Sequence, residues 1–170
     1  GAFALNGGTF DIKGRTETLG AFTLTNGTLT DGAAVGSKGL LKAASYAVSN
    51  GTINAVIADG PGGPSAMTKT TSGHLWINTT NTYTGGTNLV DGRIYAGADG
   101  TLGTGILTLT GGRLMSNGAT DRTFTNDVVI AGNVGLGNTY DPWGNPQAYT
   151  GAIIFTGGTD LNGSIRVIEN

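Results

Sequence analysis

Short apolar segments alternate with polar residues along most of the chain. Within them apolar side chains occupy every second position, as in Leu75 and Ile77. That period of two is typical of β-strands with one buried face, so we predict an all-β protein. The outward positions are mostly Thr and Asn. The predicted inward positions are Phe22, Leu24, Ile53, Val56, Ile57, Leu75, Ile77, Ile106, Leu107, Leu109, Val128, Ile130, Ile153, Phe155 and Val167.

A short phrase recurs between these segments: a turn dipeptide, then a small polar or basic residue, then an apolar one. Asn-Gly and Asp-Gly supply the positive φ that a sharp turn requires. We therefore expect each phrase to form a corner, with a strand beginning at the apolar residue. The dipeptides are Asn26-Gly27, Asn50-Gly51, Asp91-Gly92, Asp99-Gly100 and Asn162-Gly163, with looser copies at Gly7-Gly8 and Gly111-Gly112.

The spacing of the phrase separates two all-β architectures. Its glycine steps 19 residues from Gly8 to Gly27, 24 to Gly51, 41 to Gly92 and 20 to Gly112. Antiparallel hairpins use the same dipeptides, but a meander or sandwich places turns every 8 to 12 residues or so. A return at about 20 residues favours a parallel β-solenoid of about seven coils. The antiparallel sandwich is the alternative.

A longer echo suggests duplication. The segment 15–24 resembles 122–130, with Arg15 and Arg122 offset by 107 residues. We expect residues 1–170 to be a single solenoid segment of a longer repeat array, because the end of the chain, 164–170, also has the composition of a strand in progress.

The stretch 81–94, Asn-Thr-Tyr-Thr-Gly-Gly-Thr-Asn-Leu-Val-Asp-Gly-Arg-Ile, resembles the signature of the autotransporter-associated (passenger-associated) β-strand repeat. In that family a K-T-x-x-G-x-L-x-L/I strand precedes the signature; here Lys69–Ile77 fits, with His74 and Trp76 as departures. The resemblance covers about residues 66–115. It implies a right-handed parallel β-helix in a large exported surface protein, and it implies no single activity.

Composition excludes some functions. The formal net charge is −2 and the lysines do not cluster, so a nucleic-acid partner is not expected. No apolar run approaches the roughly 20 residues that span a bilayer, so we expect no membrane insertion of this segment. Cys is 0, so backbone ladders and stacked side chains must hold the fold.

The sequence gives little support for catalytic or metal-binding residues. Ser72 and His74 would share one strand face about 7 Å apart, too far for a nucleophile–base hydrogen bond. Aspartates before glycine, as at Asp31, Asp59, Asp91 and Asp99, are most simply turn residues, and only folding could gather Asp11, Glu17, Asp121 and Asp127. The tandem Gly-Gly-x-Gly-x-Asp phrase of calcium-binding repeats is missing. We therefore predict no enzyme, no catalytic residues, no metal and no cofactor.

The segment 138–149 interrupts the coil spacing with three aromatics and two prolines. We expect it to leave the solenoid as a loop that folds back over one side. Tyr140, Trp143 and Tyr149 would alternatively contact a glycan or partner. The sequence thus predicts an extracellular or cell-surface stalk, fibre or adhesin shaft that contacts itself or neighbouring repeats through exposed end coils. A glycan-binding adhesin module is the alternative, and a carbohydrate-active β-helix enzyme is the remaining one.

Overall fold

The computed structural model of the chain describes residues 1–137, 149–163 and 168–169. These residues form strands and turns, and no helix occurs among them. The strands are β1 (Phe3–Asp11), β2 (Glu17–Thr30), β3 (Leu40–Val48), β4 (Gly51–Asn54), β5 (Val56–Asp59), β6 (Met67–Lys69), β7 (His74–Ile77), β8 (Thr87–Leu89), β9 (Arg93–Ala96), β10 (Leu107–Leu109), β11 (Arg113–Ser116), β12 (Arg122–Phe124), β13 (Val128–Ile130), β14 (Val134–Leu136), β15 (Ile153–Phe155), β16 (Thr159–Asp160) and β17 (Ile168–Glu169).

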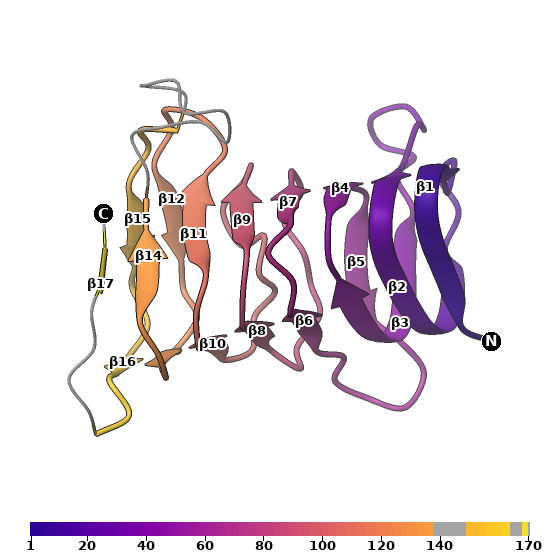
Figure 1. The fold of residues 1–170 in the computed structure, drawn as a ribbon. Coiled ribbons are helices and arrows are strands. Elements are labelled where there is room, and N and C mark those ends of the chain that lie inside the picture. Colours follow the sequence, from indigo (N-terminus) through magenta and orange to yellow (C-terminus); the bar gives the residue numbers. More distant parts are fainter. Residues whose placement is uncertain (138–148, 164–167, 170) are drawn as a thin grey trace.

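Every strand pairing in the described part of the chain is parallel. The parallel β-solenoid is therefore confirmed, and the antiparallel sandwich is wrong. The chain winds through about six turns, close to the expected seven. Figure 1 shows the stack running from β1 at one end to β14–β17 at the other. The right-handed sense of the coil stays a prediction.

The coils have three sides. Side 1 contains the pairings β1–β2–β3–β6–β8–β10–β13–β16, and side 2 contains β1–β2–β4–β7–β9–β11–β14–β17. Side 3 contains Glu17–Leu19 of β2 with β3 and β5, and further along the stack β12 with β15. The long strand β1 turns one corner and contributes to sides 1 and 2, and β2 turns two corners and contributes to all three sides.

In-register stacking places equivalent side chains in columns inside the coil. One column of side 1 is Phe22, Tyr46, Met67, Thr87, Leu107 and Val128. The next is Leu24, Val48, Lys69, Leu89, Leu109 and Ile130, in which a lysine lies among aliphatic residues. The echo between 15–24 and 122–130 does not keep one offset, because Arg15 and Arg122 differ by 107 residues whereas Phe22 and Val128, which occupy the same column, differ by 106.

Tyr46 shows how a polar group is accommodated in this core. Its ring packs against Phe22 and Tyr83, with centroids 6.3 and 5.9 Å away. Its hydroxyl accepts a hydrogen bond from the N–H of Ala43 at 3.0 Å and lies 2.8 and 2.6 Å from the carbonyl oxygens of Leu41 and Ala58. Burial raises the pKa of Tyr46 to about 12, so the phenol stays protonated.

The corner between sides 1 and 2 is made by the recurring phrase. Gly27, Gly51, Gly92 and Gly112 lie there with φ between +71° and +128°. Between β16 and β17, Asn162 and Gly163 have φ of +52° and +66°. At Gly111, φ is not in the left-handed region, but an added Cβ would lie 2.4 Å from the carbonyl oxygen of Val90. Asn26 also accepts a hydrogen bond from Asn50 of the next coil at 3.2 Å, and Asn50 in turn accepts one from the N–H of His74.

The Asp99-Gly100 dipeptide does not lie at the corner between sides 1 and 2. Gly100 has a φ of +65°, but the dipeptide lies in a turn after β9, and Leu102 lies in the same turn. The expectation that a strand begins at Leu102 is therefore wrong, although its side chain is fully buried. The turn takes the chain around side 3, where burial of an apolar residue requires no strand.

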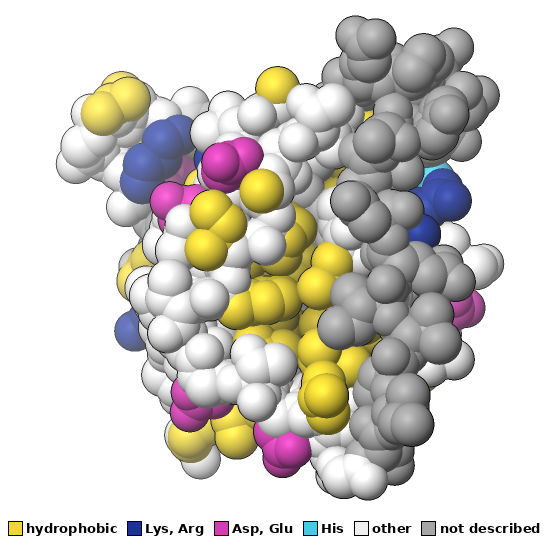
Figure 2. All heavy atoms as spheres, turned by 90° about the vertical axis from the view of Figure 1, so that its left-hand side faces the viewer, with side chains coloured by type: hydrophobic (Ala, Val, Ile, Leu, Met, Phe, Trp, Pro, Cys, Tyr) yellow, Lys and Arg dark blue, Asp and Glu magenta, His cyan; other side chains and the backbone are white. Residues whose placement is uncertain are grey.

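Most of the predicted inward side chains are buried, and one prediction is wrong. Ile106 is 56 % exposed, because Leu107 and Leu109 point inward and the alternation turns their neighbour outward. Val56, Ile153 and Phe155 are only partly buried. Val167 lies outside the described residues. In Figure 2, which faces the C-terminal end of the stack, hydrophobic side chains gather within the coil outline.

Candidate functional site

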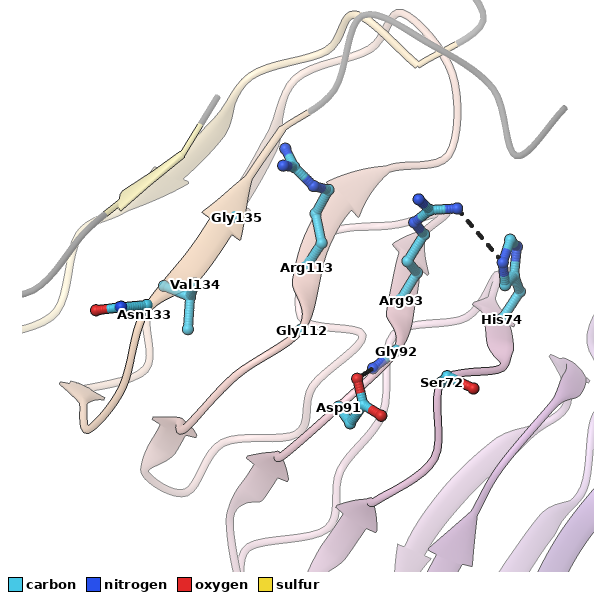
Figure 3. Close-up of a pocket in the computed structure, with 10 residues that line it drawn as sticks. All are labelled: Ser72, His74, Asp91, Gly92, Arg93, Gly112, Arg113, Asn133, Val134 and Gly135. Atoms are coloured by element: carbon cyan, nitrogen blue, oxygen red, sulfur yellow. Dashed lines mark hydrogen bonds between the residues drawn. The ribbon is translucent and has the colours of Figure 1, made fainter. Parts of the chain in front are cut away.

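A groove with a volume of about 370 Å³ lies on the outer face of side 2. We call it the side-2 groove. It crosses four successive strands, β7, β9, β11 and β14, and the corners that precede them (Figure 3). Its lining residues are Ser72, His74, Asp91, Gly92, Arg93, Gly112, Arg113, Asn133, Val134 and Gly135.

Strand register gathers the basic residues of this groove. His74 pairs with Arg93, Arg93 with Arg113, and Arg113 with Gly135. Each is the first or second residue of its strand, so all four occupy the same outward position on consecutive coils. The two arginines are the basic residues that follow the glycine in two copies of the corner phrase. Their separation of one coil could have been noticed in the sequence, but their shared groove was not predicted.

The arginine side chains point in opposite directions along the stack (Figure 3). Arg93 lies toward His74, with 3.4 Å between a guanidinium nitrogen and Nε2. Arg113 lies across Gly135 and donates a hydrogen bond of 2.9 Å to the carbonyl oxygen of Gly137. A Cβ on residue 135 would approach the Cζ of Arg113 to 2.5 Å, so glycine at this position makes room for the guanidinium.

The surroundings of His74 favour its neutral form. Partial burial lowers its pKa, and the positive charges of Arg93 and Lys69 lower it further. Its Nδ1 lies 3.3 Å from the hydroxyl of Tyr95, and its Nε2 faces Arg93. A neutral imidazole adds no positive charge next to the two arginines.

The groove brings together Ser72, His74 and Asp91, which are the three residue types of a Ser-His-Asp hydrolytic triad. Among the described residues no hydrogen bond joins His74 to Ser72 or to Asp91. The Oδ1 of Asp91 accepts the N–H of Gly92 at 2.6 Å, and the Ser72 hydroxyl points away from the imidazole (Figure 3). This arrangement lacks the nucleophile–base–carboxylate relay of a serine hydrolase.

Several other aspartates connect consecutive coils. In each connection a carboxylate accepts a backbone N–H from a residue 21 to 31 positions further along the chain. The pairs are Asp11 with Gly32, Asp59 with Thr84, Asp99 with Thr123, Asp121 with Ala152 and Asp127 with Gly158. Sequence reasoning assigned Asp59 and Asp99 only to turns, since a partner one coil away is not visible without the register.

Asp31 instead organises the loop between β2 and β3. It is 4 % exposed, and its carboxylate accepts the N–H groups of Gly14, Ala33 and Gly39. Burial alone would raise the pKa of the Asp31 carboxyl. The three N–H donors stabilise the charged carboxylate more strongly, so the net pKa lies below its ordinary value. The pKa of Asp11 is lowered by the N–H groups of Gly32 and Lys13. Predicted turn residues thus include anchors for distant backbone.

We expect Asp59→Ala to lower the melting temperature by about 5 °C. The substitution removes acceptors for the N–H groups of Ser65 and Thr84 and for the Thr84 hydroxyl, at 2.8, 2.9 and 2.8 Å. The matched control is Asp160→Ala, because Asp160 accepts only the nearby N–H of Asn162 in the hydrogen bonds described. Thermal unfolding followed by circular dichroism measures both.

The difference in melting temperature between Asp59→Ala and the parent chain should also depend on pH. Burial tends to raise the pKa of Asp59, but the hydrogen bonds that its carboxylate accepts lower it by more. Its folded-state pKa therefore lies below the ordinary 3.8. The stabilisation is therefore present above pH 3.8 and is lost as the pH falls through the lowered pKa. Equal melting temperatures of the two proteins at pH 7 would contradict a role for Asp59 in joining coils.

Outward aromatic residues form a cluster that sequence reasoning missed. Trp76 and Tyr95 stack with centroids 4.8 Å apart and an interplanar angle of 12°, and both lie within 6 Å of the His74 ring. Tyr149 packs on Tyr95 at 4.9 Å. Of the predicted ligand-binding residues, Tyr149 is therefore partly buried against side 2, while Tyr140 and Trp143 lie outside the described residues.

Comparison with known proteins gives no assignment: no family model, curated protein or solved structure matches the chain. The described residues contain no helix long and apolar enough to cross a membrane. They also contain no group of three or more His, Cys, Asp or Glu residues arranged to hold a metal ion.

Proposed function

We propose that this chain is a structural segment of a secreted or cell-surface protein, serving as a stalk, fibre or adhesin shaft. The observation that carries this proposal is the continuous in-register pairing on sides 1 and 2, from β1 through β16 and β17. A solenoid of this kind lengthens by adding coils, and each coil interacts only with its neighbours. The resemblance of 81–94 to passenger-associated repeats supports the extracellular location.

The core columns support a mechanical role. Phe3, Phe22 and Tyr46 lie in one column, with the Phe3 and Phe22 rings parallel to within 3° and 6.1 Å apart. Such columns bury an apolar face that no single coil could bury alone. Stiffness then follows from repetition of the same packing along the axis.

The end coils support association with further coils. At the β1 end Phe3, Phe10 and Leu19 are only partly buried, and at the other end Leu136, Ile153 and Phe155 are. β1 pairs with β2 along one edge. No strand of the described residues pairs with its other edge, so backbone groups there are available to a further strand. We propose that this partner is another coil, from a neighbouring repeat or a second copy of the chain.

Phe3→Glu tests this association. A carboxylate in the end column should oppose stacking of another coil, because burying it carries a large desolvation cost. We expect the parent chain to form rods whose length in electron micrographs falls with dilution, and the variant to form single short rods. Val35→Glu is the matched control, since Val35 is 98 % exposed in the loop between β2 and β3.

Parent rods that stay single at every concentration would contradict association through the ends. Surface labelling of intact source cells with an antibody to the segment, compared with permeabilised cells, tests the location separately. The glycan-binding alternative is tested by Trp143→Ala on a glycan array. The expectation that the protein is not an enzyme stays a prediction.

A further inference from the structure

The outer face of side 1 carries little charge along β3, β6, β8, β10, β13 and β16, of which β6, β8 and β10 lie side by side in Figure 1. Its outward side chains form two columns, which together we call the side-1 face. One column is Ser45, Ala66, Gly86, Ile106, Asp127 and Gly158. The other is Ala47, Thr68, Asn88, Thr108, Val129 and Asp160. Two aspartates are thus the charged members of the face, and depletion of charge is typical of the centre of a protein interface.

Ile106 projects from this face next to a hollow. Its side chain is 56 % exposed, and Gly86, its neighbour on the preceding coil, has no side chain to pack against it. A groove of about 210 Å³ lies over Gly86, with Ile106 and Ala66 in its lining. A second groove, of about 330 Å³, lies on the other flank of Ile106, toward Gly158. The face therefore presents an apolar projection and an unfilled hollow one coil apart.

A projection beside a hollow makes the side-1 face complementary to itself. In a two-fold symmetric contact, a residue that meets a second residue of the partner is met in return by the same pair. A two-fold axis parallel to the strands, midway between Gly86 and Ile106, places each Ile106 over the Gly86 groove of the other copy. The two stacks then lie face to face and run in opposite directions.

The same half-turn keeps the carboxylates of the two copies apart. It places Asp127 opposite Ala66 and Asp160 opposite Ala47, so each carboxylate faces an alanine. Stacks that ran in the same direction would instead bring the two Asp127 side chains to one level of the stack, and the two Asp160 side chains to the next. Because like charges brought together across an interface are unfavourable, charge favours the antiparallel arrangement.

We propose that the side-1 face binds a second copy of this chain side by side and antiparallel, with Ile106 of each copy in the Gly86 groove of the other. The overlap covers about 24 Å along the stack and about 13 Å across it. The two copies together bury roughly 600 Å², which is the range of weak, transient interfaces. Each coil added in a longer array enlarges the contact, so pairing should strengthen with array length. This surface is separate from the end coils, and the inference goes beyond the end association proposed above.

Sedimentation equilibrium of the full chain carrying Phe3→Glu, which opposes end stacking, tests the lateral contact. We expect a monomer–dimer equilibrium with a Kd of about 100 μM. Adding Ile106→Lys should raise that Kd at least tenfold, because the ammonium would enter the partner's groove beside the partner's own lysine. Ile154→Lys is the matched control, since Ile154 is an isoleucine of β15 on side 3 that is 41 % exposed, and its Kd should be unchanged. Circular dichroism of each variant verifies that the fold is retained.

Cross-linking tests the register, because the chain has no cysteine of its own. The half-turn places Thr68 opposite Val129, so a mixture of Thr68→Cys and Val129→Cys proteins should cross-link through a short bismaleimide more efficiently than either protein alone. A chain that stays monomeric at every concentration, an Ile106→Lys variant that pairs as tightly as its parent, or Thr68→Cys protein that cross-links alone as well as in the mixture would each overturn the proposal. None of these results bears on end stacking, which the rod lengths of the chain without Phe3→Glu measure separately.

Discussion

Lys69→Met is expected to raise the free energy of unfolding by about 2 kcal/mol at pH 7. The Lys69 side chain is fully buried in a column between Val48 and Leu89, and burial lowers its pKa to about 8 against opposition from the Asp91 carboxylate. A difference of about 2.5 pKa units corresponds to about 3 kcal/mol. Losing the hydrogen bond from Nζ to the carbonyl oxygen of Thr71 offsets about 1 kcal/mol of that gain.

The parent chain should show a rise in stability with pH that the Lys69→Met variant lacks. Between pH 8 and about 10 the unfolded lysine, with a pKa of 10.5, binds more protons than the folded one, so stability rises with pH. Above about pH 10 the raised pKa values of the buried Tyr46 and Tyr83 phenols reverse the slope, because the unfolded tyrosines ionise first. Urea unfolding at several pH values measures both slopes.

Lys42→Met is the matched control, because Lys42 is an outward-facing, half-buried residue of β3. We expect it to leave the rise between pH 8 and 10 intact. Two results would show that the buried ammonium does not cause the rise in stability with pH. One is a Lys69→Met variant that is less stable than the parent at pH 7, and the other is a variant that keeps the same rise.

Gly132→Ala is expected to destabilise the fold by about 3 kcal/mol or more. A Cβ on residue 132 would lie 1.8 Å from the carbonyl oxygen of Thr110 on the adjacent coil. The Gly132 N–H donates to Leu109 at 3.1 Å, so moving the backbone outward would also break a hydrogen bond between coils. The measurement is the urea midpoint, or the soluble yield if the variant fails to fold.

Gly118→Ala is the control that separates two effects of replacing a glycine: a steric clash with a neighbouring coil and strain in the backbone conformation. Gly118 has a φ of +121°, yet an added Cβ there would meet nothing within 4 Å. We expect it to cost only the conformational strain of a non-glycine residue, about 1 kcal/mol. Equal losses in the two variants would show that the approach of Thr110 to Gly132 is not limiting.

The fold class of this chain, an all-β parallel solenoid, can be predicted from local chemistry. The return of the Asn-Gly and Asp-Gly phrase at about one coil, combined with alternation in pairs such as Leu75 and Ile77, predicted parallel stacking. The prediction failed where one coil has a turn in place of a strand, because Leu102 satisfies the same phrase as Ile94 without forming a ladder. Ile106 failed because two adjacent apolar residues cannot both face inward in one extended segment.

The candidate site depended on information that local patterns do not contain. Arg93 and Arg113 follow corner glycines, so their common column could have been derived from the coil spacing. The opposite orientation of their side chains depends on His74 and Gly135, which lie on two further coils. The hydrogen bond between Asp59 and Thr84 likewise requires the register across 25 residues.

The ladders that join the coils run approximately parallel to the long axis of the stack, since hydrogen bonds of a sheet lie across its strands. A pulling force along that axis is therefore borne by all the bonds between two neighbouring coils together, with the carboxylate of Asp59 or Asp127 adding to the strands. Bonds on three sides must yield before two coils separate. Under tension the molecule would resist first and then extend in discrete increments, each releasing one loop of chain as slack.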